Sequence, residues 1–190
     1  LWLRAHQSAP PGFTAYRAAG ANELHALVSD IWRLARALPT APLHAYQKQV
    51  EAELRAAQTT GATEIERMVK QRVGQDVFRG SLMDYWNGAC AVTGVTHTRL
   101  LRASHIIPWA ECDSDAERLD VFNGLLLAAH LDAAFDAGLI SFEDDGSIQI
   151  AAALCGDDCA RLGIHDGLRL SRVPPQIIPR LGWHREHLFK

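Results

Sequence analysis

Three groups of polar residues in the middle of the chain have the types and spacing that hydrolytic chemistry requires. His105 lies in the run LLRASHIIPWAE, Asn123 precedes the run GLLLA, and Asp132 and Asp136 are four residues apart in a segment of helical pattern. Residues four apart lie above one another on a helix face, and two carboxylates placed so repel each other unless a cation lies between them. The pair therefore predicts a site for magnesium or manganese, which prefer oxygen ligands. A solvated acidic helix face is the alternative that spacing alone leaves open.

His105 is an ionisable residue in an otherwise apolar strand pattern. Alternation along the strand places it on one face with Leu101 and Ala103, while Arg102 and Ser104 lie on the other. An imidazole with a pKa of about 6.5 can accept a proton from water at neutral pH. We consider two interpretations of His105, a general base and a core histidine held by a hydrogen bond.

Asn123 and His130 are interpreted differently, although both lie close to the other candidates. Asn-Gly is a common turn dipeptide, but here a buried strand follows directly, so the Asn123 amide is expected to bridge the loop backbone and orient the His105 ring. His130 lies two residues before Asp132, which is about 200° around a helix. We therefore expect His130 to be a surface or packing residue and not a ligand of the same metal.

Local pattern predicts the elements that must position these side chains. The expected order is a strand at 101–107, a strand at 124–127, a helix at 128–137 and a hairpin over 139–150. Proline and tryptophan end the first strand, Gly138 ends the helix, and Asp145-Gly146 forms the hairpin turn. The central part of the chain thus has the pattern strand, loop, strand, helix.

The first 88 residues are predicted to be helical. Apolar residues recur at helical spacing in four segments, which are 22–38, 43–57, 64–73 and 76–86. The third segment is expected to end at Gly74, because glycine often terminates helices. We divide the chain into a helical extension (1–88), a central core (89–150) and a C-terminal basic tail that packs on the core (151–190).

Composition and charge limit the class of protein. With 48% hydrophobic and 22% charged residues the chain is globular, and no apolar run reaches the roughly 18 residues of a membrane span, so a soluble cytoplasmic protein is expected. The net charge of −3 argues against a general polyanion binder. Residues 111–145 hold ten acidic residues and one basic, and residues 161–190 hold six basic and two acidic. These runs predict a cation-binding and a phosphate-binding patch, with scattered surface charge as the alternative.

The cysteines and the first residue add two expectations. Cys90, Cys112, Cys155 and Cys159 contain no CxxC pair, which excludes a four-thiolate zinc knuckle. Free thiols are expected, with a metal site or cross-link of the last two as the alternative. The chain begins with leucine and not methionine, so a longer protein with an upstream sensor or target-recognition domain is expected.

Several motifs in order resemble the HNH endonuclease family. They are CAVTG, ASHIIPW, ERLDVFNGLLL and LDAAFDAGLISF, within residues 64–150, and the flanking QRVGQDVFR and HREHLF are similar to the same branch. The resemblance implies an α+β protein with a ββα-metal core that hydrolyses phosphodiester bonds. It assigns His105 as general base, Asn123 as the residue that holds this ring, and Asp132 and Asp136 as metal ligands.

Ser104 departs from the family pattern, which often has aspartate or histidine there as a further ligand. A neutral hydroxyl is a poor ligand, so weakly bound Mg²⁺ or Mn²⁺ is expected in preference to Zn²⁺, with Ser104 at its edge. His105 as a metal ligand is the alternative. The residues expected to contact DNA phosphates are Arg99, Arg102, Arg79 and Lys70.

The expected function is metal-dependent cleavage of double-stranded DNA in restriction or defence. The alternatives are an inactive DNA- or partner-binding module that retains the fold, and a nuclease that acts on RNA. Beyond DNA, the expected partners are the upstream domain and a second copy of the chain.

Overall fold

The computed structural model describes residues 4–6, 15–38, 40–56 and 63–190, and for residues 4–6, 15–17 and 63 it describes the backbone alone. In chain order the elements are β1 (Arg4–His6), β2 (Ala15–Arg17), α1 (Ala21–Ala37), α2 (Thr40–Ala56), α3 (Thr63–Tyr85), η1 (Thr98–Leu100), β3 (Leu101–His105), η2 (Trp109–Glu111), α4 (Asp115–Arg118), η3 (Val121–Asn123), β4 (Gly124–Ala128), α5 (Ala129–Asp136), β5 (Ile140–Phe142), β6 (Ile148–Ile150), α6 (Gly156–Leu162) and α7 (Ile178–His187). Helices combined with small antiparallel strand pairs confirm the predicted α+β class. No helix in these described ranges is both long enough and apolar enough to cross a membrane.

The sequence predicted that the N-terminal part is entirely helical, but the structure also contains a pair of strands there. Strands β1 and β2 pair antiparallel, with Arg4 opposite Arg17. Each strand has only three residues, which is too short for an alternating pattern to stand out. The prediction of helix throughout residues 1–88 is therefore wrong for this hairpin.

Helix α3 continues through Gly74, where the sequence predicted an end. The indole of Trp109 packs against the helix at this point, and a Cβ atom on Gly74 would lie 2.3 Å from the indole Cη2 atom. Glycine costs roughly 1 kcal/mol relative to alanine inside a helix, but here it makes room for the ring. The predicted break at residues 74–75 is wrong because tertiary packing, and not a helix end, requires this glycine.

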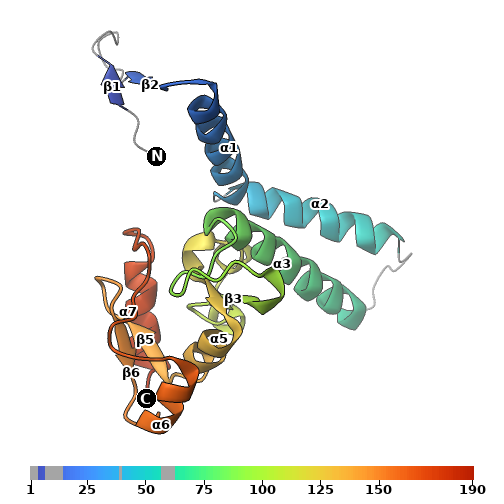
Figure 1. Ribbon diagram of the computed structural model, residues 1–190. Helices are drawn as coiled ribbons and strands as arrows, with labels where there is room; N and C mark the ends of the chain where they lie inside the picture. Colours follow the sequence, from blue (N-terminus) through green and yellow to red (C-terminus); the bar gives the residue numbers. More distant parts are fainter. Residues whose placement is uncertain (1–3, 7–14, 39, 57–62) are drawn as a thin grey trace.

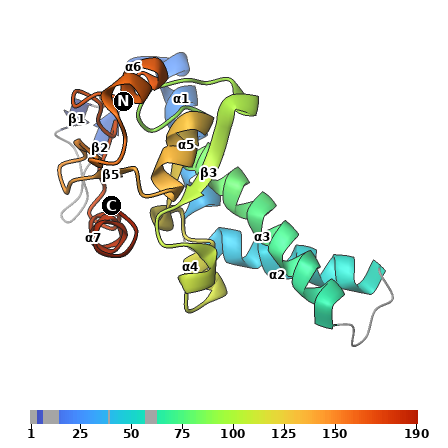
Figure 2. The same ribbon diagram turned by 90° about the horizontal axis from the view of Figure 1, so that it is seen from below.

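The central unit consists of β3, β4 and α5 in the predicted order. Strands β3 and β4 pair antiparallel, and their register places His105 opposite Gly124. Strand β3 ends at His105, two residues earlier than predicted, because Ile106 and Ile107 already bond to Asn123 in the loop. In Figures 1 and 2 this unit lies between α3 on one side and α7 on the other.

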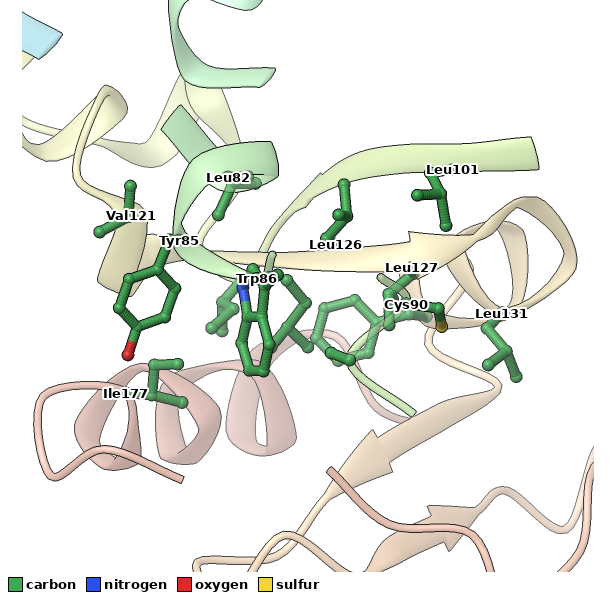
Figure 3. Close-up of a cluster of buried hydrophobic side chains, with 14 of the residues drawn as sticks. Leu82, Tyr85, Trp86, Cys90, Leu101, Val121, Leu126, Leu127, Leu131 and Ile177 are labelled. Atoms are coloured by element: carbon green, nitrogen blue, oxygen red, sulfur yellow. The ribbon is translucent and has the colours of Figure 1, made fainter. Parts of the chain in front are cut away.

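One hydrophobic core connects α3, the β3–β4 pair and the C-terminal part. Figure 3 shows Leu82 and Trp86 from the end of α3 beside Leu126 of β4, with Ile177 of the C-terminal segment on the same cluster. All of β4 is buried. The core is therefore continuous across the proposed boundaries at residues 88 and 150, and the end of α3 packs directly on the strands that carry the candidate site.

The acidic and basic runs of the sequence pair with each other. Three ion pairs join them: Arg169 with Asp145 at 3.6 Å, Arg180 with Asp120 at 2.7 Å and Arg185 with Asp144 at 2.6 Å. The two runs are thus not two free patches, because these arginines help to hold the C-terminal segment on the central unit. All four cysteines lie in the described residues and are free thiols.

Candidate active site

The imidazole ring of His105 is enclosed on two sides by aromatic rings. Phe78 of α3 stacks on it with ring centroids 3.8 Å apart and planes 15° from parallel. Trp109, in the loop after β3, meets it edge-on with a centroid distance of 5.7 Å. The ring is therefore fixed between a helix that precedes the central unit and the loop within it, while part of the residue stays open to solvent.

A hydrogen bond fixes which nitrogen of His105 carries the proton. Nε2 lies 2.9 Å from the main-chain carbonyl oxygen of Arg118. A carbonyl oxygen accepts and cannot donate, so Nε2–H donates to it, and Nδ1 of the neutral ring keeps a free lone pair. Burial lowers the pKa of His105, partly opposed by the bond to the Arg118 carbonyl. The ring is therefore both tethered at one nitrogen and able to accept a proton at the other at neutral pH.

Asn123 is fully buried and ties together the loop that follows His105. Its Oδ1 accepts from the main-chain N–H of Ile107 at 2.9 Å, and its Nδ2 donates to the Ile107 carbonyl at 3.1 Å and to Cys112 Sγ at 3.3 Å. The predicted bridge to the loop backbone is present. Asn123 contacts the backbone two residues beyond His105 and not the ring itself, so any effect on the base is transmitted through this loop.

The main-chain carbonyl of Arg118 orients His105, a role that could not be predicted from the sequence. The Arg118 guanidinium donates to the main-chain oxygens of Trp109 and Cys112 and pairs with Asp115 at 3.1 Å. These contacts fold the loop between β3 and β4 into one unit around the base. A main-chain carbonyl is present in every residue, so residue type could not have pointed to this contact.

Asp132, Asp136 and Ser104 form a cluster of oxygen donors beside the base. Ser104 is buried on β3, and its hydroxyl donates to Asp136 Oδ1 at 3.3 Å. Partial burial raises the pKa of Asp132, and partial burial together with the negative charge of Asp132 raises the pKa of Asp136. Helix α5 thus brings together the two carboxylates that the sequence paired, with no basic side chain in an ion pair with either among the described residues.

This donor set suits a hard divalent cation bound with few protein ligands. Two carboxylates and a hydroxyl offer only oxygen ligands. Mg²⁺ and Mn²⁺ prefer oxygen ligands, whereas tightly bound Zn²⁺ usually has nitrogen or sulfur ligands. Within the part of the chain that the structure describes, no three His, Cys, Asp or Glu side chains are placed to hold a metal ion. Water and substrate oxygens would have to complete the coordination shell.

A cleft of about 330 Å³ joins the base to the carboxylate side of the site. Its lining includes Ser104, His105 and Asp136 from the central unit, and His184 and Leu188 from the C-terminal segment. Neither Asp132 nor His130 is part of this lining, so the place of His130 away from the metal ligands stays a prediction. The sequence did not indicate that the C-terminal segment forms a wall of this cleft.

The four basic residues expected at DNA have different surroundings. Arg79 donates to the carbonyls of Leu101 and Thr98, both at 2.8 Å, and so fastens α3 to the start of β3. Lys70 pairs with Glu66 one turn earlier on the same helix. Arg99 and Arg102 are exposed near the start of β3, and the structure shows no ion pair for either.

Comparison with protein families agrees with this geometry. Residues 90–143 match the family model described as HNH endonuclease. The matched segment contains β3, β4, α5 and β5, and with them His105, Asn123 and both aspartates. The resemblance drawn from the motifs is thereby confirmed over the central unit. Phe78 and His184 lie outside the match. A comparison with curated proteins gives no match.

The central unit is therefore an HNH nuclease domain. Domains of this class cleave nucleic acid and generally use a divalent metal ion.

Proposed function

We propose that this protein is a metal-dependent endonuclease that hydrolyses phosphodiester bonds of double-stranded DNA, in restriction or defence, with His105 as general base. One observation carries the proposal: His105, with Nε2 bonded to the Arg118 carbonyl, shares a cleft with Ser104 and Asp136. The ring thus has one fixed nitrogen and one nitrogen without a hydrogen bond in the described residues, and it lines the same cleft as one of the proposed cation ligands. A histidine serving only the core would have no need of this cleft.

In the proposed reaction Nδ1 of His105 removes a proton from a water molecule, which attacks the scissile phosphorus. The bond from phosphorus to the leaving oxygen breaks, and that oxygen takes a proton from solvent water. The bond from Nε2 to the Arg118 carbonyl keeps the ring oriented and stabilises the imidazolium that forms. A divalent cation held by Asp132 and Asp136, with Ser104 beside them, would neutralise the charge that develops on the phosphate oxygens. Mg²⁺ or Mn²⁺ fits these oxygen donors better than Zn²⁺ does.

Exposed arginines near the start of β3 support phosphate binding. Arg99 and Arg102 have no carboxylate partner in the described ranges, and phosphate contacts of this kind position DNA without reading its sequence. Arg79 and Lys70 are proposed as weaker contributors, because Arg79 is half-buried with both guanidinium amino groups bonded to carbonyls, and Lys70 is paired with Glu66. Arg102 is exposed and uses only one amino group, on the carbonyls of Arg99 and Leu101. The upstream sensor domain, a homodimer and a cytoplasmic location stay predictions.

An inactive binding module is the second candidate, and Ser104 favours it. A serine stands where the family often has an ionic ligand, which leaves two carboxylates as the ionic part of the metal site. An inactive module would bind DNA equally well with and without Mg²⁺ and would leave it intact. An RNA substrate would leave the site unchanged and is distinguished by the choice of substrate.

The test is incubation of the purified protein with supercoiled plasmid in Mg²⁺, Mn²⁺ or EDTA. His105→Ala serves as the base variant and His130→Ala as the matched histidine control. Metal-dependent nicking or linearisation that disappears in His105→Ala and persists in His130→Ala would support the proposal. Binding of a labelled duplex measured in parallel should be nearly equal for the three proteins. Tight binding without cleavage, in either metal and with RNA as well as DNA, would favour the inactive module.

A further inference from the structure

His184 is a fully buried histidine that attaches α7 to the end of α5. Its ring stacks on Phe135 with centroids 3.8 Å apart and planes 9° from parallel. Its Nε2 lies 3.2 Å from the Phe135 carbonyl oxygen, and its Nδ1 lies 3.0 Å from Ser141 Oγ on β5. Since the carbonyl only accepts, Nε2 donates to it and Nδ1 accepts from the serine hydroxyl. Both ring nitrogens and one ring face of His184 thus contact the nuclease domain, at α5 and at β5.

These contacts fall on the last turn of α5, where Asp136 is located. The last carbonyls of a helix lack partners within the helix and are satisfied from outside. The Phe135 carbonyl receives Gly138 N–H at 2.9 Å in addition to the His184 ring. Asp136 is the next residue, so its backbone is anchored through the carbonyl that His184 holds. Asp132 lies one turn earlier, and among the described residues no side chain bonds to the carbonyl that precedes it.

The chain beyond His184 strengthens the same attachment. The N–H of Lys190 donates to the Gly138 carbonyl at 3.1 Å. A Cβ atom on Gly138 would lie 2.0 Å from the Leu188 carbonyl oxygen, so only glycine allows this approach. Leu188 and His184 both line the cleft that contains His105 and Asp136. The C-terminal segment is therefore fixed to the turn that carries the second carboxylate.

We infer that His184 is a positioning residue that holds the Asp136 carboxylate in place for the divalent cation. It does so from outside the segment that matches the HNH family. The inference rests on the proposed function, since it assigns Asp136 to the cation. Groups that hydrogen-bond directly to a metal ligand commonly contribute 10- to 100-fold to metal affinity, because they orient the ligand before the metal binds. His184 acts one residue away, through the Phe135 carbonyl, so an effect at the lower end of this range is expected. A residue that merely fills the core would contribute to stability without this effect on the metal.

The test measures Mn²⁺ binding by calorimetry in a His105→Ala background, which removes His105 as an alternative metal ligand. His184→Phe keeps a stacking ring but removes both hydrogen bonds, and it should weaken Mn²⁺ binding about tenfold. His184→Gln retains a donor for the Phe135 carbonyl and should recover part of that loss. His187→Gln is the matched control, because His187 lies one turn along α7 and stacks on the partly exposed Trp183. Its Mn²⁺ affinity should equal that of the background.

A second readout uses cleavage by the otherwise unaltered protein. His184→Phe should raise the metal concentration for half-maximal activity and should change kcat at saturating metal much less. If His184→Phe does not fold, Ser141→Ala removes only the partner of Nδ1 and should produce a smaller shift in the same direction. Unchanged Mn²⁺ affinity in a folded His184→Phe or Ser141→Ala protein would overturn the inference.

Asp132→Asn and Asp136→Asn separate this inference from the proposed function. Both should weaken Mn²⁺ binding, because each removes a carboxylate of the metal site. If neither does, the metal assignment itself fails, and the role of His184 fails with it. If both do and His184→Phe does not, only the role of His184 is overturned.

Discussion

The Nε2 atom of His105 and the main-chain oxygen of Arg118 are 2.9 Å apart and join the first strand of the nuclease domain to the end of the loop that follows it. This bond leaves Nδ1 as the free acceptor of the neutral ring. Phe78 covers one ring face from a helix that precedes the family match. The state of the base on β3 is therefore set by residues on two other elements, α3 and α4.

The pH dependence of cleavage should reflect the burial of His105. Burial lowers the pKa of His105. The ring therefore stays unprotonated, and active, at pH values below the ordinary histidine pKa of about 6.5. Phe78→Ala exposes the ring and should move the acid limb of the kcat/KM profile, measured at saturating metal, to higher pH. Phe142→Leu, another buried phenylalanine, should lower stability and leave the limb in place. An unshifted limb in Phe78→Ala would show that this stacking does not control the base.

Asn123→Ala should lower both stability and activity. The substitution leaves the Ile107 N–H without its partner and leaves the Ile107 carbonyl with only the weak Cys112 thiol as donor. An unsatisfied buried polar group costs about 1–3 kcal/mol. Urea unfolding measures the loss, with Asn22→Ala at the exposed start of α1 as control. A loss within about 0.5 kcal/mol, the range of ordinary surface changes, would contradict this account of the loop.

Gly74→Ala and Gly80→Ala form a matched pair on α3 with opposite expected results. A Cβ atom at residue 80 meets nothing within 4 Å, so alanine there should stabilise the protein by roughly 0.5–1 kcal/mol through helix propensity. At residue 74 the Cβ atom would displace the indole of Trp109, which borders His105. Thermal unfolding should show a higher Tm for Gly80→Ala and a lower one for Gly74→Ala, with reduced cleavage. Equal gains from both would mean that the indole moves aside at no cost.

The central unit could be predicted from the sequence because its signals are local. The strand pattern around His105, the Asn123-Gly124 pair and the spacing of Asp132 and Asp136 each lie within a few residues. The order of β3, β4 and α5 follows from them, and so does the placement of the two carboxylates on one helix.

The surroundings of the site could not be predicted, because they come from distant residues. Phe78 is distant in sequence from His105, on which it stacks, and His184 is also distant from Phe135 and Ser141. Gly74 has the local pattern of a helix end, yet its glycine makes room for Trp109. Local sequence does not indicate which side chain will pack against which helix.

DNA binding should depend on salt through Arg99 and Arg102. Each phosphate contact that is lost lowers the slope of log K against log salt by about 1, so Arg99→Ala and Arg102→Ala should each reduce the slope by about that amount. Arg169→Ala is the control, because its guanidinium is exposed but paired with Asp145 on the far hairpin turn. Fluorescence anisotropy with a labelled duplex over a range of salt measures the slope. An equal change in Arg169→Ala would point to a general effect of net charge.

Acid should destabilise the protein partly through His184. Burial lowers the pKa of His184 to about 4, whereas the ring has a pKa of about 6.5 in the unfolded chain. The unfolded state therefore binds more protons between these values, and stability is fully present above about pH 6.5 and is lost progressively as the pH falls toward 4. Denaturant unfolding of the metal-free protein at pH 7 and pH 5 measures this loss. It should be smaller in His184→Phe, which has no proton to bind, and unchanged in His187→Gln. An identical loss in all three proteins would mean that other groups account for the acid sensitivity and that His184 does not hold α7 to α5 as a neutral ring.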